Sequence, residues 1–160
     1  MLSSTDLKPS ARQVQAALVV LGVDARVLEM PQTTRTAADA AAAIGCSVAQ
    51  IVKSLVFRGT TTGKPCLILV SGPNRVNEQA LGLLIGEPIE KARPDFVRET
   101  TGYAIGGVPP IAHATPLAAW LDRSLLLHDV VWAAAGTPES VFPIAPQKLA
   151  DITNAVPFDI

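Results

Sequence analysis

The first part of the chain places apolar residues at helical spacing and then in a short extended run. A helix is predicted over residues 11–21, with Ser10 as its N-cap and Gly22 after its last turn. Residues 26–30 predict a strand that stops at Pro31, because proline rarely continues a strand. A helix followed by a strand therefore opens the predicted fold.

Two capping signals follow this strand. Thr36 and Asp39 have the spacing of a capping box, which predicts the start of an alanine-rich helix over residues 37–44. Ser47 and Gln50 repeat that spacing and predict a second, very short helix. Helical structure is thus expected up to the centre of the chain.

The centre of the chain predicts a β-hairpin. Residues 53–58 and 66–71 are strand-like runs, and the glycine-bounded segment 59–63 joins them as a turn. The remaining pattern predicts helices over 77–85 and 94–101, strands near 116–121, 129–135 and 141–144, and a last helical turn from Pro146. Helices mixed with hairpin strands indicate a mixed α/β (α+β) fold rather than a purely parallel sheet.

The composition limits the class of protein. Of 160 residues, 49% are hydrophobic and 17% are charged, which predicts one folded domain over residues 1–160 and argues against intrinsic disorder. The longest apolar runs, 16–21 and 130–135, are far shorter than the roughly 20 residues of a membrane helix, and no secretory signal is visible. Two cysteines without a CxxC pair and two histidines disfavour a disulfide scaffold or a metal site. We expect a cytoplasmic protein without a membrane partner.

The charge is nearly neutral overall but uneven along the chain. A net charge of −1 excludes a generally basic nucleic-acid coat protein. Residues 53–98 hold seven bases and four acids (net +3), whereas residues 99–160 hold two bases and six acids (net −4). This asymmetry fits either one basic face or an ordinary solvated surface.

Lys53 is the first candidate for chemistry. The period of two along a strand places it on the same face as Leu55 and Phe57, which should be the buried face. An ammonium at the mouth of an apolar layer can bind a phosphate, a carboxylate or a carbonyl oxygen. The alternative is a lysine whose stem packs while its amino group extends into water.

The loop over residues 105–113 is the second candidate. Its two glycines, Gly106 and Gly107, allow a ligand to approach the backbone closely, and the prolines that follow stiffen the segment. His113 could carry a proton near neutral pH, although a lone histidine is more often structural, as we expect for His128. The same loop could equally be a structural turn.

The usual nucleophile and cofactor motifs are missing from the sequence. It contains no nucleophile elbow, Walker loop, zinc-protease helix or dinucleotide-binding glycine motif. A further tight turn over residues 136–139 could border a pocket. We therefore expect no cofactor, and any catalysis must come from binding and orientation.

Four segments, taken in order, carry a resemblance. Residues 36–41, 50–57, 106–113 and 135–136 are similar to the motifs of the YbaK/ProX family, the stand-alone relatives of the editing domain in bacterial prolyl-tRNA synthetases. The similarity covers about residues 10–153. It implies a curved, partly barrel-like mixed sheet flanked by helices, and hydrolysis in trans of the ester in mischarged aminoacyl-tRNA.

The resemblance also implies roles for individual residues. Lys53 matches the family's required lysine, which contacts the terminal phosphate region or the aminoacyl end. The family's Gly-X-X-X-Pro loop, whose backbone holds the aminoacyl group and the terminal ribose, corresponds to Gly106, Gly107, Val108, Pro109 and Pro110. With Lys53 and Gly106, His113 completes the predicted catalytic set.

A second part of the predicted site surrounds this set. Gly136 matches the glycine of a pocket-lining turn, and Thr137 follows it. Arg58 and Arg75, from the basic segment, are predicted to bind RNA. The family is thought to use neither a metal nor a protein nucleophile, but a positioned water and a ribose hydroxyl.

The substrate implied is a tRNA, tRNA(Pro) first, that carries a small non-cognate amino acid. The loop lacks the Pro-Phe pair of the alanine-editing branch, and the N-terminal half differs from the cysteine-editing branch, so Ala, Cys, Ser, Thr and a non-protein analogue stay open. The expected partners are the acceptor end of the tRNA and prolyl-tRNA synthetase, and not DNA. The alternatives are a non-catalytic module that binds tRNA or a synthetase, and a hydrolase for another small ester or amide.

Overall fold

One mixed sheet of eight strands forms the centre of the molecule in the computed structural model, which describes residues 6–30 and 36–160. Its strands are β1 (Leu28–Glu29), β2 (Ile51–Gly59), β3 (Pro65–Ser71), β4 (Ile89–Lys91), β5 (Ala118–Asp122), β6 (Val131–Ala134), β7 (Ser140–Ile144) and β8 (Val156–Phe158). The helices are α1 (Pro9–Val20), α2 (Ala37–Ile44), α3 (Glu78–Ile85), α4 (Pro94–Thr101) and α5 (Pro146–Thr153), with short 3-10 helices η2 (Val48–Gln50) and η3 (Arg123–Leu127). The predicted mixed α/β class is confirmed.

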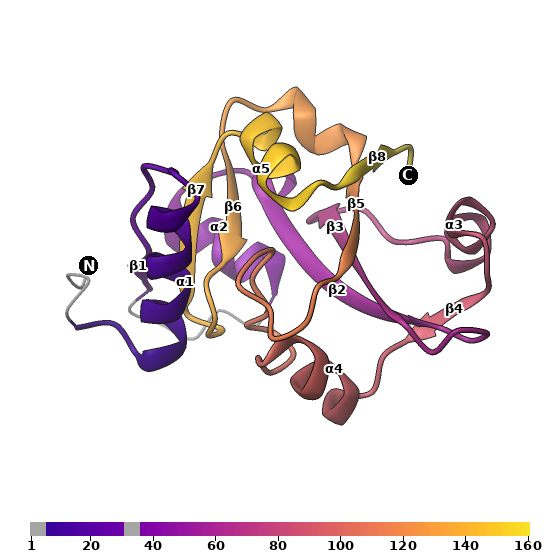
Figure 1. Ribbon diagram of the computed structural model, residues 1–160. Coiled ribbons are helices and arrows are strands. Elements are labelled where there is room, and N and C mark those ends of the chain that lie inside the picture. Colours follow the sequence, from indigo (N-terminus) through magenta and orange to yellow (C-terminus); the bar gives the residue numbers. More distant parts are fainter. Residues whose placement is uncertain (1–5, 31–35) are drawn as a thin grey trace.

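The strands lie in the order β1-β7-β6-β2-β3-β5-β8, and β4 pairs with β2. The pairs β1–β7, β6–β7, β2–β3 and β2–β4 are antiparallel, whereas β2–β6, β3–β5 and β5–β8 are parallel. The predicted central hairpin is β2–β3. These two long strands run obliquely to β5, β6 and β7, so the sheet is strongly curved (Figure 1).

Helices flank this curved sheet. The indigo helix α1 lies beside β7 at one side of the molecule, and α3 with β4 forms an arm at the opposite side (Figure 1). The apolar face of α1, with Ala11, Val14 and Leu18, is fully buried in the largest cluster of the core. Within the described ranges, no helix is long and apolar enough to cross a membrane.

Strand β2 is buried on both faces. Val52 and Val56 belong to the largest cluster, together with side chains of α1, β6 and β7. On the other face, Phe57 belongs to a second cluster with Ile68 of β3 and Leu81 of α3. The prediction of a single buried face was therefore incomplete, because side chains of α1, β6 and β7 pack with one face of β2 and side chains of α3 pack with the other.

The local signals near the N-terminus are largely confirmed. Thr36 Oγ1 accepts a hydrogen bond of 3.0 Å from the Asp39 N–H, and the Thr36 N–H donates one of 3.3 Å to Asp39 Oδ2, as a capping box requires. Ser47 and Gln50 likewise open the short η2, where the Ser47 N–H donates to Gln50 Oε1 at 3.1 Å. The two capping pairs, each three positions apart in the sequence, thus mark the starts of α2 and η2 correctly.

Three sequence predictions need correction. Ser10 is not the N-cap of α1, because Pro9 takes the first helical position and Lys8 the cap. The first strand is shorter than 26–30, since only Leu28 and Glu29 pair with β7; its predicted end at Pro31 lies outside the described residues. The elements β4, β8 and η3 were not predicted because each is too short to show a period.

Candidate functional site

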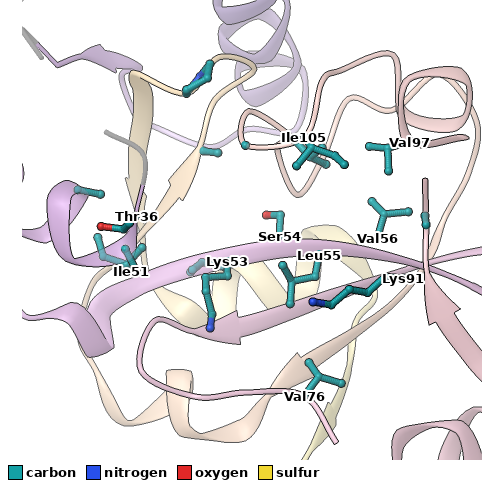
Figure 2. A pocket seen from close by; sticks show the side chains of 18 of the residues that line it. Thr36, Ile51, Lys53, Ser54, Leu55, Val56, Val76, Lys91, Val97 and Ile105 are labelled. Carbon is teal, nitrogen blue, oxygen red and sulfur yellow. The ribbon is translucent and has the colours of Figure 1, made fainter. Parts of the chain in front are cut away.

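A cleft of about 850 Å³ follows the middle of β2. This volume lies within the range of small-molecule sites, about 300–1,000 Å³. Ile105, Gly106 and Val108 face β2 from the predicted loop, and α4 contributes Val97. Figure 2 shows Ser54 and Val56 on the side of β2 that faces Ile105 and Val97, whereas the amino group of Lys53 points to the other side. The cleft therefore extends over both faces of one strand.

The cleft reaches both faces because one edge of β2 is open at this point. On this edge β6 pairs with Ile51 and Val52, and β4 pairs with residues 57–59, which leaves residues 53–56 without a partner strand in the described part of the chain. On the opposite edge β3 pairs along residues 52–58 without interruption. This unpaired stretch lies between the two sides of the cleft and leaves backbone groups of β2 without a strand partner there.

Lys53 lies at the rim of the opening. Its Nζ donates a hydrogen bond of 2.5 Å to the backbone carbonyl of Asn74, in the loop after β3. Burial lowers the pKa of Lys53 and the nearby Arg75 lowers it further, while the charge of Asp122 acts in the opposite direction. The lysine is thus half-buried, held in place by a backbone group and available to an anion from the cleft.

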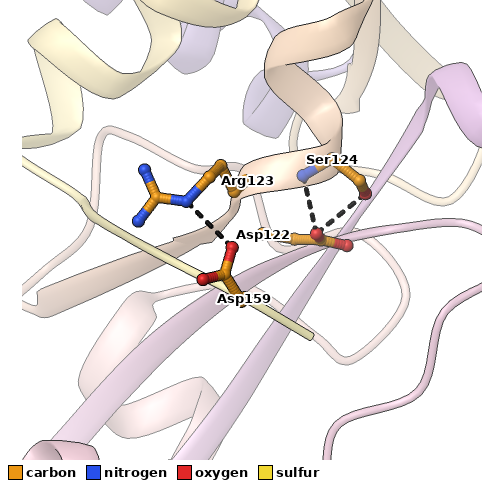
Figure 3. A network of polar contacts seen from close by, with 4 residues as sticks. All are labelled: Asp122, Arg123, Ser124 and Asp159. Carbon is orange, nitrogen blue, oxygen red and sulfur yellow. Dashed lines mark hydrogen bonds and ion pairs between the residues drawn. The ribbon is translucent and has the colours of Figure 1, made fainter.

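Asp122, at the end of β5, holds the loop that carries this backbone group. Its side chain is fully buried and accepts hydrogen bonds from Asn74 Nδ2 at 2.8 Å and from the Ser71 N–H at 3.1 Å. Ser124 donates two more to the same carboxylate, through its N–H at 3.0 Å and its hydroxyl at 2.8 Å (Figure 3). The neighbouring Arg123 instead pairs with Asp159 at 2.9 Å.

The pKa of Asp122 reflects these contacts. Burial raises the pKa of this carboxyl, but the hydrogen bonds from Asn74, Ser124 and Ser71 outweigh burial, so the pKa lies below its usual value. Asp122 is therefore an ionised, fully buried anchor. It fixes Asn74, whose carbonyl in turn fixes Lys53.

Basic side chains dominate the charged part of the cleft. Lys53, Arg75 and Lys91 line it, and Glu78 is the one acid among its described lining residues. Arg75 and Lys91 are exposed, so they can reach a phosphate in solvent. Arg58 does not line the cleft but lies over the ring of Phe96, 5.3 Å from its centroid. The structure thus brings Arg75 and Lys53 together and places Arg58 elsewhere.

The predicted glycine loop is held by the second predicted turn. A Cβ on Gly107 would lie 2.9 Å from Thr137 Cα, and the Gly107 carbonyl accepts a hydrogen bond of 3.0 Å from the Gly136 N–H. Gly107 therefore permits a close contact between two loops rather than between loop and ligand. Gly106, with φ of +94°, is the glycine that faces the cleft.

Most of the other predicted residues of these loops lie behind the cleft wall. Pro109 and Pro110 are buried, and Thr137 contacts the cleft-lining Ser140 through a hydroxyl–hydroxyl hydrogen bond of 2.5 Å. Val108 and Pro138 line the cleft directly. The structure thus places some residues of the two predicted loops on the cleft lining and others behind it as support.

His113 belongs to a different place. It lines a smaller cavity of about 240 Å³ with Pro110 and Ile152, and its Nε2 lies 2.6 Å from the Pro109 carbonyl. Burial lowers the pKa of His113, against a smaller opposing effect of that hydrogen bond. The structure therefore does not bring His113 together with Lys53, and its contact with Pro109 braces the loop.

Sequence reasoning missed three residues of this site. Ser54 shares the cleft with Lys53, and Lys91 adds a cation from β4, an element that was not predicted. Asp122 appeared only as one of the acids of the C-terminal segment. A serine next to a candidate lysine on a strand was a usable signal, whereas the Asp122 contacts join residues about 50 positions apart and had none.

No metal is suggested by the donor groups. Within residues 6–30 and 36–160, no three His, Cys, Asp or Glu side chains lie close enough together to hold a metal ion. What the cleft offers is a cationic region, an apolar region and backbone groups at an open strand edge. Such a site can bind and orient a ligand that has both a phosphate and a small apolar part.

Comparison with known proteins agrees with this geometry. The family model described as the aminoacyl-tRNA editing domain matches residues 31–152, most of the chain. The chain belongs to this family. The prediction of an aminoacyl-tRNA editing deacylase is thereby confirmed, and a mischarged tRNA is the substrate that this family implies.

Individual relatives of this editing domain point the same way. A crystal structure of "a putative trans-editing enzyme for prolyl tRNA synthetase" is 50% identical, covers 96% of this chain and 98% of its own, and superposes with a TM-score of 0.92. The uncharacterized protein YwhH of Bacillus subtilis is 32% identical over 79% of this chain and 80% of its own. A protein of Enterococcus faecalis named "Putative Cys-tRNA(Pro)/Cys-tRNA(Cys) deacylase EbsC" is 25% identical over 74% of this chain and 73% of its own.

Proposed function

We propose that this editing domain acts in trans on tRNA(Pro) that carries a small non-cognate amino acid, and that Lys53 and the 105–110 loop form its active site. The observation that carries the proposal is the cleft itself, which joins a cationic region around Lys53 to an apolar region under the loop. Similarity to the trans-editing structure and to the deacylase EbsC supports tRNA(Pro) as the nucleic acid.

The cationic region suits the 3′ end of a tRNA. Lys53, Arg75 and Lys91 all line the cleft and can neutralise the last phosphates of the tRNA. Lysine binds such a phosphate as a point charge, and the fixed Asn74 carbonyl keeps its amino group at the rim. Binding of this kind positions the terminal ribose, and with it the ester, at the opening in β2.

The apolar region suits a small side chain. Val56, Val97 and Val108 line it, and Ile105 covers it from the loop. Selection among small amino acids then depends on volume, and one methylene changes binding by only about 1–3 kcal/mol. A panel of small amino acids should therefore show graded rates rather than one exclusive substrate.

Hydrolysis needs little chemistry from the protein, because an aminoacyl ester is already activated. A water oxygen bonds to the carbonyl carbon, the ester C–O bond breaks, and the ribose oxygen leaves with a proton from that water. Orientation of the ester and of the water supplies much of the rate in such a reaction. Backbone groups of the 105–110 loop and the charge of Lys53 can stabilise the oxyanion that forms.

The proposal is tested by a deacylation panel. Ala-, Cys-, Ser- and Thr-tRNA(Pro) and cognate Pro-tRNA(Pro) are incubated with the protein, and the release of amino acid is followed, with and without prolyl-tRNA synthetase. We expect at least one small non-cognate amino acid to be released well above the buffer rate while Pro-tRNA(Pro) is spared. Release no faster than in buffer would favour a non-catalytic binding module. Equal rates on a free aminoacyl ester would favour a hydrolase that ignores RNA.

A further inference from the structure

Among the described residues, two side chains have a buried oxygen without a hydrogen-bond partner, Glu29 and Ser54, and only Ser54 lines the cleft. Less than 1 Å² of its Oγ is accessible, and this oxygen has no hydrogen-bond partner in the described structure. Buried hydroxyls are almost always hydrogen-bonded, because leaving one unpaired costs about 1–3 kcal/mol. Such a group in a cleft is a candidate for a ligand contact.

The backbone of Ser54 is also turned to the opening in the sheet. The Gly72 N–H donates to the Ile51 carbonyl, and the Gly59 N–H donates to the Lys64 carbonyl, so odd-numbered residues of β2 point their backbone groups toward β3. Even-numbered residues then point to the other edge, and the Ala92 N–H indeed donates to the Val56 carbonyl there. At Ser54 no strand occupies that edge in the described part of the chain.

The hydroxyl lies on the apolar side of the cleft. Ser54 shares a strand face with Val52 and Val56, and Figure 2 shows its oxygen on the side that faces Ile105. Lys53, one residue earlier, directs its amino group to the opposite side. Adjacent residues thus serve the two sides of the cleft: a cation for phosphate, and a hydroxyl among apolar side chains.

We propose that Ser54 is a substrate-contacting residue whose hydroxyl hydrogen-bonds the aminoacyl ester as the substrate crosses the open edge of β2. The inference rests on the proposed function and adds to it a specific contact. A hydroxyl can donate to the ester carbonyl and accept from the α-ammonium group, the two polar groups of the aminoacyl moiety. A tRNA that carries no amino acid has neither group at its 3′ end, so we expect its binding not to involve Ser54.

The test compares Ser54→Ala with the wild-type protein in three measurements. We expect kcat/KM on the misacylated tRNA(Pro) that the wild type deacylates best to fall roughly 10- to 100-fold, since a hydrogen bond to a polarised or charged group is lost. The Kd for uncharged tRNA(Pro) should stay within about twofold. The melting temperature should stay equal or rise, by about 2–4 °C, because an unpaired buried hydroxyl is removed.

Thr101→Val is the matched control. Thr101 is also a buried hydroxyl residue, but its Oγ1 is fully partnered, donating to the Val97 carbonyl at 2.7 Å and accepting from the Tyr103 N–H at 3.0 Å. This variant should melt at a lower temperature and keep its kcat/KM.

Two results would overturn the role of Ser54. One is a kcat/KM within twofold of wild type for Ser54→Ala. The other is a parallel fall in its melting temperature, tRNA affinity and rate, which would mark a structural role. A wild-type protein that deacylates no tRNA would instead refute the proposed function itself, before the variant is considered.

Discussion

At the residue scale, the position of Lys53 was predictable and its surroundings were not. The period of two placed it beside Leu55 and Phe57 from the sequence alone, and the structure agrees. Its partner, the Asn74 carbonyl, lies 21 residues away in a loop without a period. The neighbouring Ser54 stood beside the candidate lysine in the sequence, but that it lies at an open strand edge is visible only once the partners of β2 are known.

The lowered pKa of Lys53 predicts a pH-dependent affinity. Because burial and Arg75 favour the neutral amine, Lys53 should lose its proton, and its attraction for phosphate, at a lower pH than an ordinary lysine with a pKa of about 10.4. The affinity for uncharged tRNA(Pro) should therefore fall as the pH is raised from neutral towards this value, earlier than it would for an ordinary lysine. Fluorescence titrations across this range measure it.

Lys53→Arg is the control for this titration. A guanidinium stays charged throughout the range, so the variant's affinity should be flat with pH whatever its absolute value. Identical profiles for the variant and the wild type would show that Lys53 does not titrate in this interval.

At the element scale, the site depends on contacts between distant segments. The cleft opens where β6 leaves β2 and β4 joins it, and these three strands come from positions about 30 to 80 residues apart. The glycine loop keeps its place through Gly107 and Gly136, which meet across two connections. Local patterns predict each element, but parallel pairing and loop-to-loop contacts depend on the whole topology, and no local pattern encodes them.

Asp122 offers a test of this element-scale order. Asp122→Asn removes a charged acceptor that joins the end of β5 to the loop after β3, and it should lower the free energy of unfolding at pH 7 by about 2–3 kcal/mol. The pKa of Asp122 is lower in the folded protein than in the unfolded chain, where it is about 3.9. The ionised carboxylate therefore stabilises the folded protein above the unfolded pKa, and this stabilisation is lost as the pH falls through the folded pKa.

The difference in free energy of unfolding between the wild type and Asp122→Asn should therefore shrink in acid. Urea unfolding of both proteins at pH 7 and at about pH 3 measures this difference. A difference that is the same at both pH values would contradict an ionised, hydrogen-bonded Asp122.

At the scale of the whole molecule, charge is concentrated where the cleft needs it. The chain carries a net charge of −1, yet the described cleft lining has three bases and one acid. The sequence indicated this through the basic segment 53–98, although it could not tell which bases share a site. Arg75 and Lys91 do share one, whereas Arg58 stacks on Phe96.

This distribution predicts the salt dependence of tRNA binding. Arg75→Ala should weaken binding of uncharged tRNA(Pro) and reduce the slope of log affinity against log salt by about 0.7–1, the value for one phosphate contact. Lys148→Ala, an exposed lysine on α5 outside the cleft lining, should leave the slope unchanged. Equal slopes for wild type and both variants would mean that the cationic rim does not bind phosphate.

The most direct test of the central claim is single-turnover deacylation of misacylated tRNA(Pro) by the wild type and by Lys53→Ala. The account predicts release of the amino acid by the wild type well above the buffer rate. It predicts a loss of at least about 100-fold in Lys53→Ala, because both the phosphate contact and the stabilising charge disappear. Circular dichroism should show that the variant remains folded. A folded Lys53→Ala protein that deacylates at the wild-type rate would contradict the account.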